Sequence, residues 1–586
     1  MKPSMPSRSS LVALLVTSVF TLTPALAKTS SATATDTFAA LAVVKPVSAC
    51  TALTQVDLED IGGAGSRVTS VSESTRENVA VCVVEGLLAP QIGFRLELPT
   101  TTWAQRYLQV GCGGLCGRID MKAGAAQHCQ PLRTGAFAVA STDMGHKAAD
   151  TSFGDDPQKR ADFAHRGIHL TAFASKKLIN AFYGQKAKYA YFTGCSDGGR
   201  EALIEAQRYP EDFDGIIAGA AALNFQVQNA LYHAWMARSN TGPDGKPIML
   251  ASRLPILHKA VLAQCDVLDG QIDGLIAEPR LCHFDPAVVQ CKASADAGKC
   301  LTSQEVETIR RFYEGPKDRV SGERLIVGGP QPGSELAWAG VFVPVAADQP
   351  IFSEKIAMES IRNLVFERNP AADFKLADLR FDESTFERLR PLHALYDATN
   401  PDLSSFASRG GKLILWHGWA DPHISPLNTL AYHEAIEARM GKARAESFER
   451  LYMLPGVYHC GGGEGPSQID LLTPVMAWVE KGRAPDAIVA RQDRPDKGIG
   501  FGAPIANDTR PATANLPAFM TREDVSNRGR TRKVFPYPFM AEYDHKGYSK
   551  RANSYQRSEP LTTDKTPKWM GSGFFQPYAP MQGQSD

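Results

Sequence analysis

Ser196 stands where a predicted strand meets a predicted helix, and this arrangement limits the folds open to the chain. Residues 188–195, KYAYFTGC, form an apolar and aromatic run typical of a buried strand, and the helical pattern after the serine ends at Pro210. Gly194 and Gly198 lie two residues on either side of the serine. A strand that turns sharply into a helix needs such glycines, because larger side chains at these positions would clash. The segment therefore predicts a nucleophile elbow, with Ser196 as the nucleophile.

Strands and helices alternate around this elbow, as they do in a parallel α/β sheet. The elements predicted before it are strands over 93–99, 107–114 and 135–143 and a helix over 166–184. Those predicted after it are strands over 213–221, 410–421 and 449–459 and helices over 428–441 and 470–482. No regular alternation occurs between residues 224 and 405, where Pro and Gly recur. We expect one α/β core interrupted by an insertion that sits over the carboxyl ends of the strands.

A serine nucleophile needs a base and an acid that orients the base. In chain order, the acid should follow a late strand and a histidine should follow the last one. Asp421 and His459 occupy these two positions. Two simpler alternatives stay open: Asp421 as a turn or N-cap residue before Pro422, and His459 as a surface histidine. His417 and His423 are rival bases, but their positions fit residues that line the pocket better.

The cysteines add a constraint on the same residues. Eleven cysteines allow at most five pairs and leave one over, and their spacing lacks the paired CxxC pattern of a zinc ribbon. Cys195 directly precedes Ser196, and Cys460 directly follows His459. If the serine and the histidine meet, the two cysteines are neighbours as well and can form a disulfide. The alternative is two unrelated buried thiols.

The N-terminus has the pattern of an export signal. Lys2 and Arg8 precede an apolar run, and small residues at Ala25 and Ala27 mark a cleavage site, so we interpret residues 1–27 as a signal peptide. An uncleaved anchor is the weaker alternative, because the run is short for a membrane span and ends at Pro24. We therefore expect a secreted or periplasmic protein that has no membrane span once the signal peptide is cleaved.

Charge gives no support for a nucleic-acid partner. Lys and Arg together number 63, as do Asp and Glu, and no long basic run occurs. The same balance argues against binding to an anionic membrane. A small or neutral partner is expected, and the oligomeric state stays open.

A glycine-rich loop over 110–117, VGCGGLCG, follows an early strand and predicts an oxyanion hole. The backbone N–H of Asp197 would supply one donor, and Gly113 or Gly114 the second. A nucleotide-binding loop is a weak alternative, because neither the spacing nor a ribose-binding acid is present.

The segments YFTGCSDGGREALIEAQRYPEDFDGIIAGA, ILWHGWADPHISP and PGVYHCGGG resemble the tannase and feruloyl esterase family, which includes hydrolases of terephthalate monoesters. The resemblance covers about residues 50–540. It implies an α/β-hydrolase core in two parts, 28–223 and 406–540, with a large inserted lid domain over 224–405 and a C-terminal tail over 541–586. It also implies Ser196 as nucleophile, His459 as base, Asp421 as acid, the disulfide Cys195–Cys460, and Gly114 as the second oxyanion donor.

The remaining cysteines are assigned with the help of this resemblance. It implies the bridge Cys50–Cys82, and the lid cysteines are expected to pair as Cys265–Cys282 and Cys291–Cys300. Cys112, Cys116 and Cys129 crowd the oxyanion loop. We expect Cys116 to pair with Cys129, which leaves Cys112 as the odd thiol.

A calcium site is expected in the lid, within residues 265–282, CDVLDGQIDGLIAEPRLC. The side chains of Asp266, Asp269 and Asp273, with the backbone carbonyls of Gln271 and Leu275, would supply hard oxygen ligands in a tight turn. The resemblance supports a structural Ca²⁺ there, and no organic cofactor is expected. A solvated acidic turn is the simpler alternative.

The resemblance implies hydrolysis of esters of aromatic acids, either hydroxycinnamic or hydroxybenzoic, through an acyl-serine. Hydrolysis of a terephthalate monoester is the alternative within the family, weakened because Ile424 stands where those enzymes carry an aromatic ring. A peptidase on the same fold and a secreted binding protein without activity are the alternatives of other classes. The presence of all three candidate catalytic residues counts against the binding protein.

Overall fold

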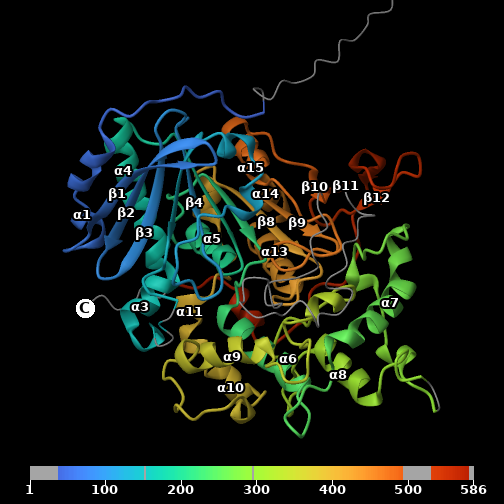
Figure 1. The fold of residues 1–586 in the computed structure, drawn as a ribbon. Helices are drawn as coiled ribbons and strands as arrows, with labels where there is room; N and C mark the ends of the chain where they lie inside the picture. The colour runs from blue at the N-terminus through green and yellow to red at the C-terminus, as the bar shows by residue number, and fades with distance from the viewer. Residues whose placement is uncertain (1–36, 149, 151–152, 294–295, 493–528, 580–586) are drawn as a thin grey trace, which may run out of the picture.

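A nine-stranded mixed sheet forms the centre of the molecule (Figure 1). The structure is a computed structural model and describes residues 37–148, 150, 153–293, 296–492 and 529–579. The strand order is β1-β2-β3-β5-β4-β6-β7-β8-β9. The strands are β1 (Arg67–Arg76), β2 (Val79–Leu88), β3 (Ile92–Pro99), β4 (Arg106–Val110), β5 (Phe137–Thr142), β6 (Tyr189–Cys195), β7 (Gly215–Gly219), β8 (Lys412–Gly418) and β9 (Glu449–Leu454).

Two halves of this sheet differ in direction. The pairs β1·β2, β2·β3 and β3·β5 are antiparallel, whereas every pair from β5 to β9 is parallel. The parallel half is the α/β core that the sequence predicts. The predicted strand over 107–114 ends early, at Val110, because the next residues leave the sheet as the glycine-rich loop.

Helices cover both faces of the sheet. The helices of the core are α1 (Glu59–Gly62), α2 (Gln130–Arg133), α3 (Pro157–Ala161), α4 (Gly167–Tyr183), α5 (Asp197–Arg208), α13 (Pro426–Met440), α14 (Lys442–Phe448) and α15 (Leu472–Lys481). Helix α4 matches the prediction for 166–184: Gly184 ends it in a left-handed conformation with φ 70°. Its predicted core face is buried, namely Ile168, Ala172, Leu178, Ile179 and Phe182.

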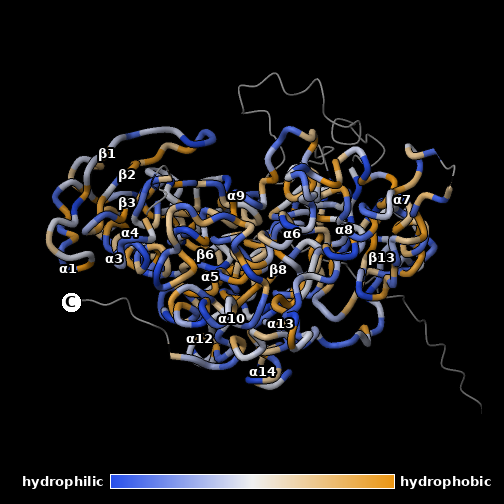
Figure 2. Tube along the Cα trace, turned by 90° about the horizontal axis from the view of Figure 1, so that it is seen from below, coloured by the Kyte–Doolittle hydropathy of each residue, from blue (hydrophilic) through white to orange (hydrophobic). Residues whose placement is uncertain are grey.

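Adjacent residues of the central strands face opposite sides of the sheet. Phe192 and Ile216 belong to one hydrophobic cluster, and their neighbours Tyr191 and Ile217 belong to the other. Because both clusters are buried, the parallel strands are apolar on both faces. Figure 2 shows hydrophobic residues running through the interior around β6 and β8.

The insertion expected over 224–405 lies between β7 and β8, which are themselves neighbours in the sheet. Its helices are α6 (His233–Ser239), α7 (Leu254–Cys265), α8 (Ser303–Glu314), α9 (Phe352–Asn363), α10 (Glu383–Glu387), α11 (His393–Tyr396) and α12 (Ser404–Ser408). In Figure 1 most of it lies below and to the right of the sheet, in green and yellow. We refer to it below as the lid.

The described residues after α15, including the tail, pack against the lid and the core. Short strands form two pairs, β10 (Ile488–Gln492) with β11 (Arg530–Val534), and β12 (Ala541–Tyr543) with β13 (Tyr555–Arg557). Further along, the ring of Phe574 stacks on His393 of α11, with 4.0 Å between centroids. The predicted signal peptide and the last residues of the chain lie outside the described residues. No helix in the described ranges is long and apolar enough to cross a membrane.

Candidate active site

Ser196, His459 and Asp421 meet at the carboxyl ends of β6, β9 and β8. His459 Nε2 lies 2.9 Å from Ser196 Oγ, and His459 Nδ1 lies 2.7 Å from Asp421 Oδ2. Ser196 has φ 65°, the strained conformation expected of a residue at a sharp strand-to-helix turn. The three residues form a continuous hydrogen-bonded chain from hydroxyl to carboxylate, which is the arrangement that activates a serine.

Close packing explains the two glycines of the elbow. A Cβ atom on Gly194 would lie 2.1 Å from the carbonyl oxygen of Gly198, and one on Gly198 would lie 2.8 Å from the carbonyl oxygen of Cys112. Both contacts are with backbone atoms, which cannot move aside without shifting the turn or the oxyanion loop. Glycine is therefore required at both positions.

Asp421 is held from two sides. Its Oδ1 accepts hydrogen bonds from the backbone N–H groups of His423 and Ile424, at 2.8 and 3.0 Å. Its Oδ2, which faces His459, also lies 3.1 Å from Nε2 of His417. Burial alone would raise the pKa of Asp421, but His459 and His417 outweigh it and hold that pKa well below its usual range. Asp421 is therefore ionised near neutral pH.

His417 has a role that differs from the sequence prediction. We expected it to line the pocket, but its side chain is fully buried behind Asp421. Its Nδ1 lies 2.7 Å from the hydroxyl of Thr429, and its Nε2 lies 3.1 Å from the carbonyl oxygen of Ile424 as well as from Asp421. Two acceptors at Nε2 place the proton on that atom. His423 does line the cavity, as predicted.

Two backbone N–H groups near Ser196 are available for an oxyanion. Asp197 is the first residue of α5, and Gly114 has φ 67° at the tip of the glycine-rich loop. Within the described residues, neither amide donates a hydrogen bond to another backbone group. Both predicted N–H donors can therefore bind an oxyanion. Asp197 and Gly114 line the same cavity as Ser196.

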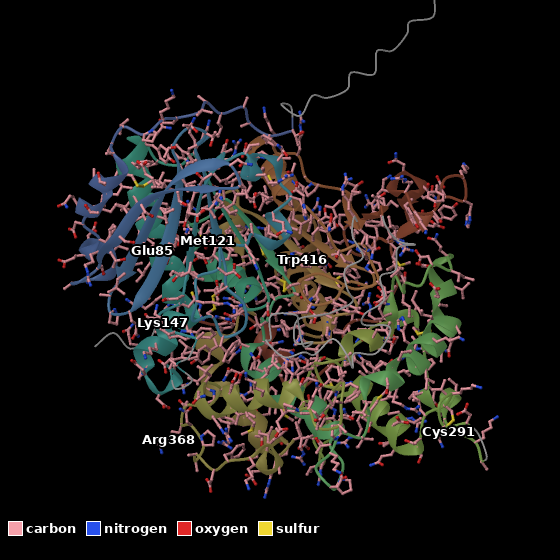
Figure 3. The ribbon with its side chains drawn as sticks, in the orientation of Figure 1. Glu85, Met121, Lys147, Cys291, Arg368 and Trp416 are labelled. Carbon is pink, nitrogen blue, oxygen red and sulfur yellow. A yellow bond between two sulfur atoms is a disulfide. The ribbon has the colours of Figure 1, made fainter. Side chains whose placement is uncertain are left out.

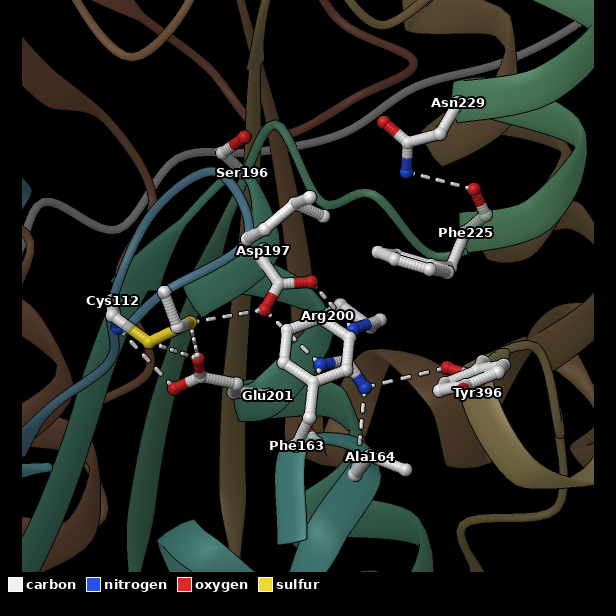
Figure 4. A network of polar contacts seen from close by, with 12 residues as sticks. Cys112, Phe163, Ala164, Ser196, Asp197, Arg200, Glu201, Phe225, Asn229 and Tyr396 are labelled. Carbon is white, nitrogen blue, oxygen red and sulfur yellow. Dashed lines mark hydrogen bonds and ion pairs between the residues drawn. A yellow bond between two sulfur atoms is a disulfide. The ribbon is translucent and has the colours of Figure 1, made fainter. Parts of the chain in front are cut away.

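A buried polar network lies beneath the oxyanion loop (Figure 4). Arg200, fully buried, donates to both carboxylate oxygens of Asp197, at 2.6 and 3.0 Å, and to the carbonyl oxygens of Phe163 and Ala164. Glu201 Oε2 accepts a hydrogen bond from the backbone N–H of Cys112, at 3.3 Å. Burial, reinforced by the charge of Asp197, raises the pKa of Glu201 well above its usual value. The network joins α5 to the loop that carries Gly114.

The catalytic chain opens into a cavity of about 150 Å³ between the core and the lid. Its apolar walls come from the oxyanion loop, the start of the lid, helix α9 and the segment after Asp421: Leu115, Phe225, Phe352, Ile356 and Ile424. An engineered cavity of about the same volume, 150 Å³, binds benzene, so one aromatic ring fits a space of this size.

The sequence profile of the tannase and feruloyl esterase family matches residues 74–558. The chain belongs to this family. An esterase of Xanthomonas campestris is 35% identical over 479 residues, which are 73% of this chain and 81% of that protein. The mono(2-hydroxyethyl) terephthalate hydrolase of Piscinibacter sakaiensis is 30% identical over 536 residues, 80% of this chain and 83% of that enzyme.

Among solved structures, feruloyl esterase B of Aspergillus oryzae superposes with a TM-score of 0.70 at 25% identity, covering 87% of this chain and all of that one. The family and the structural similarity agree with the α/β-hydrolase core and the inserted lid. The protein is a carboxylic ester hydrolase, since its relatives are esterases.

The described residues contain five disulfides, and four of them are pairs that the sequence predicts. They are Cys50–Cys82, Cys195–Cys460, Cys265–Cys282 and Cys291–Cys300, the last in an outer loop of the lid (Figure 3). Cys195–Cys460 links residues 265 positions apart, with 5.9 Å between Cα atoms, and so ties the nucleophile elbow to the histidine loop.

The prediction for the oxyanion loop cysteines was wrong. Cys116 pairs with Cys112, four residues away, because the loop turns back on itself at Gly114 and Cys116, both with positive φ. Cys129 is the free cysteine, buried on the other face of the sheet with its sulfur 3.9 Å from Met476 Sδ. Burial raises the pKa of its thiol to about 12, so it is not a reactive thiolate.

The acidic lid loop contacts strand β11, which the sequence did not predict. Arg530 and Arg532 of β11 lie 2.8 and 2.9 Å from Asp273 Oδ2, and Arg532 lies 3.2 Å from Asp269 Oδ2. Asp266 accepts the backbone N–H of Gly274, at 2.9 Å. Burial raises the pKa of Asp269 to about 6 despite the neighbouring guanidinium of Arg532.

These groups fit calcium in kind, because carboxylate and carbonyl oxygens are its preferred ligands. The positive charges of Arg530 and Arg532 balance only two of the three negative charges of the aspartates in this loop. Elsewhere, the described residues bring two other sets of ligand atoms within 4.8 Å of one another: Cys112, Cys116, Asp197 and Glu201, and His169, Glu205 and Asp212. The sulfurs of the first set are joined in a disulfide, which removes them as metal ligands.

Proposed function

We propose that this enzyme hydrolyses esters of aromatic carboxylic acids through an acyl-serine intermediate. One observation supports this most: the chain Ser196–His459–Asp421 opens directly into a cavity that is walled by aromatic and aliphatic side chains and is large enough for one ring. Relatives named feruloyl esterase and terephthalate-monoester hydrolase act on esters of this chemical class.

In the first step, His459 Nε2 takes the proton of Ser196 Oγ as that oxygen attacks the ester carbonyl carbon. Asp421 accepts a hydrogen bond from Nδ1–H of His459, which orients the imidazole and stabilises the imidazolium. The backbone N–H groups of Asp197 and Gly114 donate hydrogen bonds to the oxyanion of the tetrahedral intermediate. His459 then gives the proton to the leaving alkoxide, and the C–O bond to the alcohol breaks.

In the second step, water enters where the alcohol has left. His459 Nε2 removes a proton from this water as its oxygen attacks the acyl carbon, and the same two N–H groups hold the new oxyanion. The bond to Ser196 Oγ breaks as His459 returns the proton to it. The aromatic acid leaves and the free serine is restored.

We also propose that the protein is exported, to the periplasm or beyond the cell. Disulfides form and persist in oxidising compartments, and five are present among the described residues. The predicted signal peptide over 1–27 agrees with this. Sequencing the N-terminus of the mature protein from the producing cell would test it, with Lys28 as the expected first residue.

A structural calcium ion in the lid is a further proposal. Asp266, Asp269 and Asp273 would hold it with the carbonyl groups of Gln271 and Leu275. Its charge would hold the turn that the Cys265–Cys282 disulfide closes. It takes no part in the reaction above.

The experiment for the main proposal compares four substrates: methyl gallate, methyl ferulate, chlorogenate and a terephthalate monoester. Wild-type protein, Ser196→Ala and Ser408→Ala are assayed, the last a control on the exposed end of α12. We expect turnover of at least one aromatic ester by wild type and Ser408→Ala, and loss of about 10⁶-fold in Ser196→Ala. Turnover of aliphatic esters alone would contradict the proposal.

A further inference from the structure

The tip of the oxyanion loop is loosely packed. A Cβ atom added to Gly113 or Gly114 would meet no atom within 4 Å, apart from those of its chain neighbours. Both glycines line a second cavity, of about 220 Å³, which shares Gly114 and Leu115 with the cavity at Ser196. A catalytic N–H group must stay within about 0.5 Å of its productive position. Contacts elsewhere in the loop must therefore fix the position of Gly114.

The disulfide Cys112–Cys116 closes the tip into a short loop. The Cα atoms of the two cysteines are 5.4 Å apart, with Gly113, Gly114 and Leu115 between them. Inside this closed loop, the backbone N–H of Cys116 donates to the carbonyl oxygen of Gly113, at 3.2 Å. A closed loop of this size has few conformations, so a displacement of Leu115 also displaces Gly114.

The segment after β5 binds the oxyanion loop at three points. The backbone N–H of Gly117 donates to the carbonyl oxygen of Asp143, at 3.1 Å, and the backbone N–H of Ala148 donates to the carbonyl oxygen of Gly117, at 2.9 Å. The third contact reaches the closed loop itself: His146 Nε2 lies 2.7 Å from the carbonyl oxygen of Leu115. Because a carbonyl oxygen can only accept, Nε2 carries a proton and donates it to this hydrogen bond.

Packing holds the imidazole of His146 in this orientation. It stacks on Phe153, with 3.9 Å between centroids and 15° between planes, and meets Phe163 edge-on at 6.0 Å. The side chain is buried, and burial lowers the pKa of His146, so the imidazole is neutral near neutral pH. A rigid donor therefore binds Leu115, the residue next to Gly114.

We propose that His146 is a positioning residue for the oxyanion hole: by binding the carbonyl of Leu115, it keeps the N–H of Gly114 directed at the oxyanion. The inference rests on the oxyanion hole of the proposed function, but not on the aromatic acyl group. Both steps of the reaction pass through an oxyanion at the same place. Loss of the hydrogen bond should slow both steps alike, which lowers kcat and leaves KM little changed.

The test uses p-nitrophenyl acetate and 4-methylumbelliferyl acetate, which share an acyl group and differ in the size of the alcohol. His146→Phe can keep the stack on Phe153 but has no donor. We expect its kcat to fall about 10- to 100-fold on both esters, with KM within about twofold of wild type.

Two amide variants keep the test decisive if His146→Phe does not fold. His146→Gln can place an amide N–H near the position of Nε2, whereas the shorter His146→Asn cannot. We expect kcat within about threefold of wild type for His146→Gln and a loss of about tenfold or more for His146→Asn.

His393→Phe is the matched control. His393 is also buried and stacks on a phenylalanine, Phe574, with 4.0 Å between centroids and 15° between planes. It lies in the lid and bonds Asp397, not the oxyanion loop. This variant should lower the melting temperature and leave kcat unchanged.

Each outcome decides the inference. It is overturned if kcat of His146→Phe stays within about threefold of wild type, if the Gln and Asn variants are equally active, or if His393→Phe loses as much. A rise in KM that is larger for the larger alcohol also overturns it, since His146 would then bind the leaving alcohol in the second cavity. Failure of the proposed function is distinct: wild type would cleave both acetates and no aromatic ester, and the His146 variants would still be compared.

Discussion

His417 Nε2 lies 3.1 Å from Asp421 Oδ2, the same oxygen that accepts the hydrogen bond of His459. The catalytic acid therefore has a second imidazole behind it, which is anchored in turn to Thr429. This contact fixes the direction in which Asp421 points. His417 positions the acid and touches no substrate.

Replacing His417 with asparagine should lower kcat about tenfold or more, with KM little changed, because a small shift of Asp421 misplaces His459. The acid side of the pH–rate profile should move as well, since Asp421 loses a partner for its charge. His433→Asn is the control: His433 is also buried, but its ring bonds Glu449, away from the site. Equal losses in both variants would indicate a general effect on folding and contradict the positioning role.

The Cys195–Cys460 disulfide should matter for both stability and turnover. The double variant Cys195→Ser/Cys460→Ser should lower the free energy of unfolding by about 2–5 kcal/mol, because the bond closes a very long loop. It should also lower kcat, since nothing else covalent ties His459 to the elbow. The control variant Cys291→Ser/Cys300→Ser removes a disulfide between cysteines only nine positions apart. It should leave kcat unchanged. Unchanged turnover in the first variant would show that packing alone aligns the two loops.

The calcium proposal predicts that a chelator lowers the melting temperature and that added Ca²⁺ restores it. Asp266→Asn should remove this response. Metal analysis of the purified protein checks the same point independently, and about one calcium per chain is expected. If the chelator has no effect while Arg532→Gln lowers the melting temperature, the two arginines neutralise the loop without an ion.

Burial of Glu205 predicts a pH dependence of stability. Its carboxyl group is fully buried, and burial, reinforced by the neighbouring carboxylate of Asp212, raises its pKa well above the ordinary 4.5. The folded state thus keeps a proton that the unfolded state releases above pH 4.5. The free energy of unfolding should fall as pH rises from that value toward the folded pKa, by up to about 1.4 kcal/mol per pH unit.

Glu205→Gln should remove this slope, because glutamine keeps the shape and has no proton to release. Chemical denaturation between pH 5 and about 8 measures it. A slope that is equal in wild type and Glu205→Gln would assign the dependence to other groups, of which buried Glu201 is the first to examine.

Local patterns were sufficient to predict the elbow, the acid and the base, because each follows a strand of a parallel sheet and such strands end at one edge. The same logic placed Cys195 beside Cys460. It failed for Cys112 and Cys116, whose pairing depends on the positive φ angles of the turn between them. A glycine-rich string alone does not specify those angles.

Contacts between distant segments could not be predicted either. Arg530 and Arg532 reach Asp273 across more than 250 residues, and no local pattern marks them as its partners. His417 was seen as a candidate, but its burial behind Asp421 depends on the packing of α13 against β8. In each case the residue types were visible in the sequence, but the tertiary contacts between distant segments were not.

The lid leaves the core after β7 and returns to it before the adjacent parallel strand β8. Near its end, the backbone N–H of Ala398 donates to the carbonyl oxygen of Leu223, just before its start, at 2.9 Å, so a backbone hydrogen bond holds the two ends close together. The intervening residues can lengthen, shorten or be exchanged while the serine, the acid and the histidine keep their places. Within such a scaffold, a lineage can acquire new substrates by altering one continuous stretch of gene, and the reaction itself is inherited unchanged.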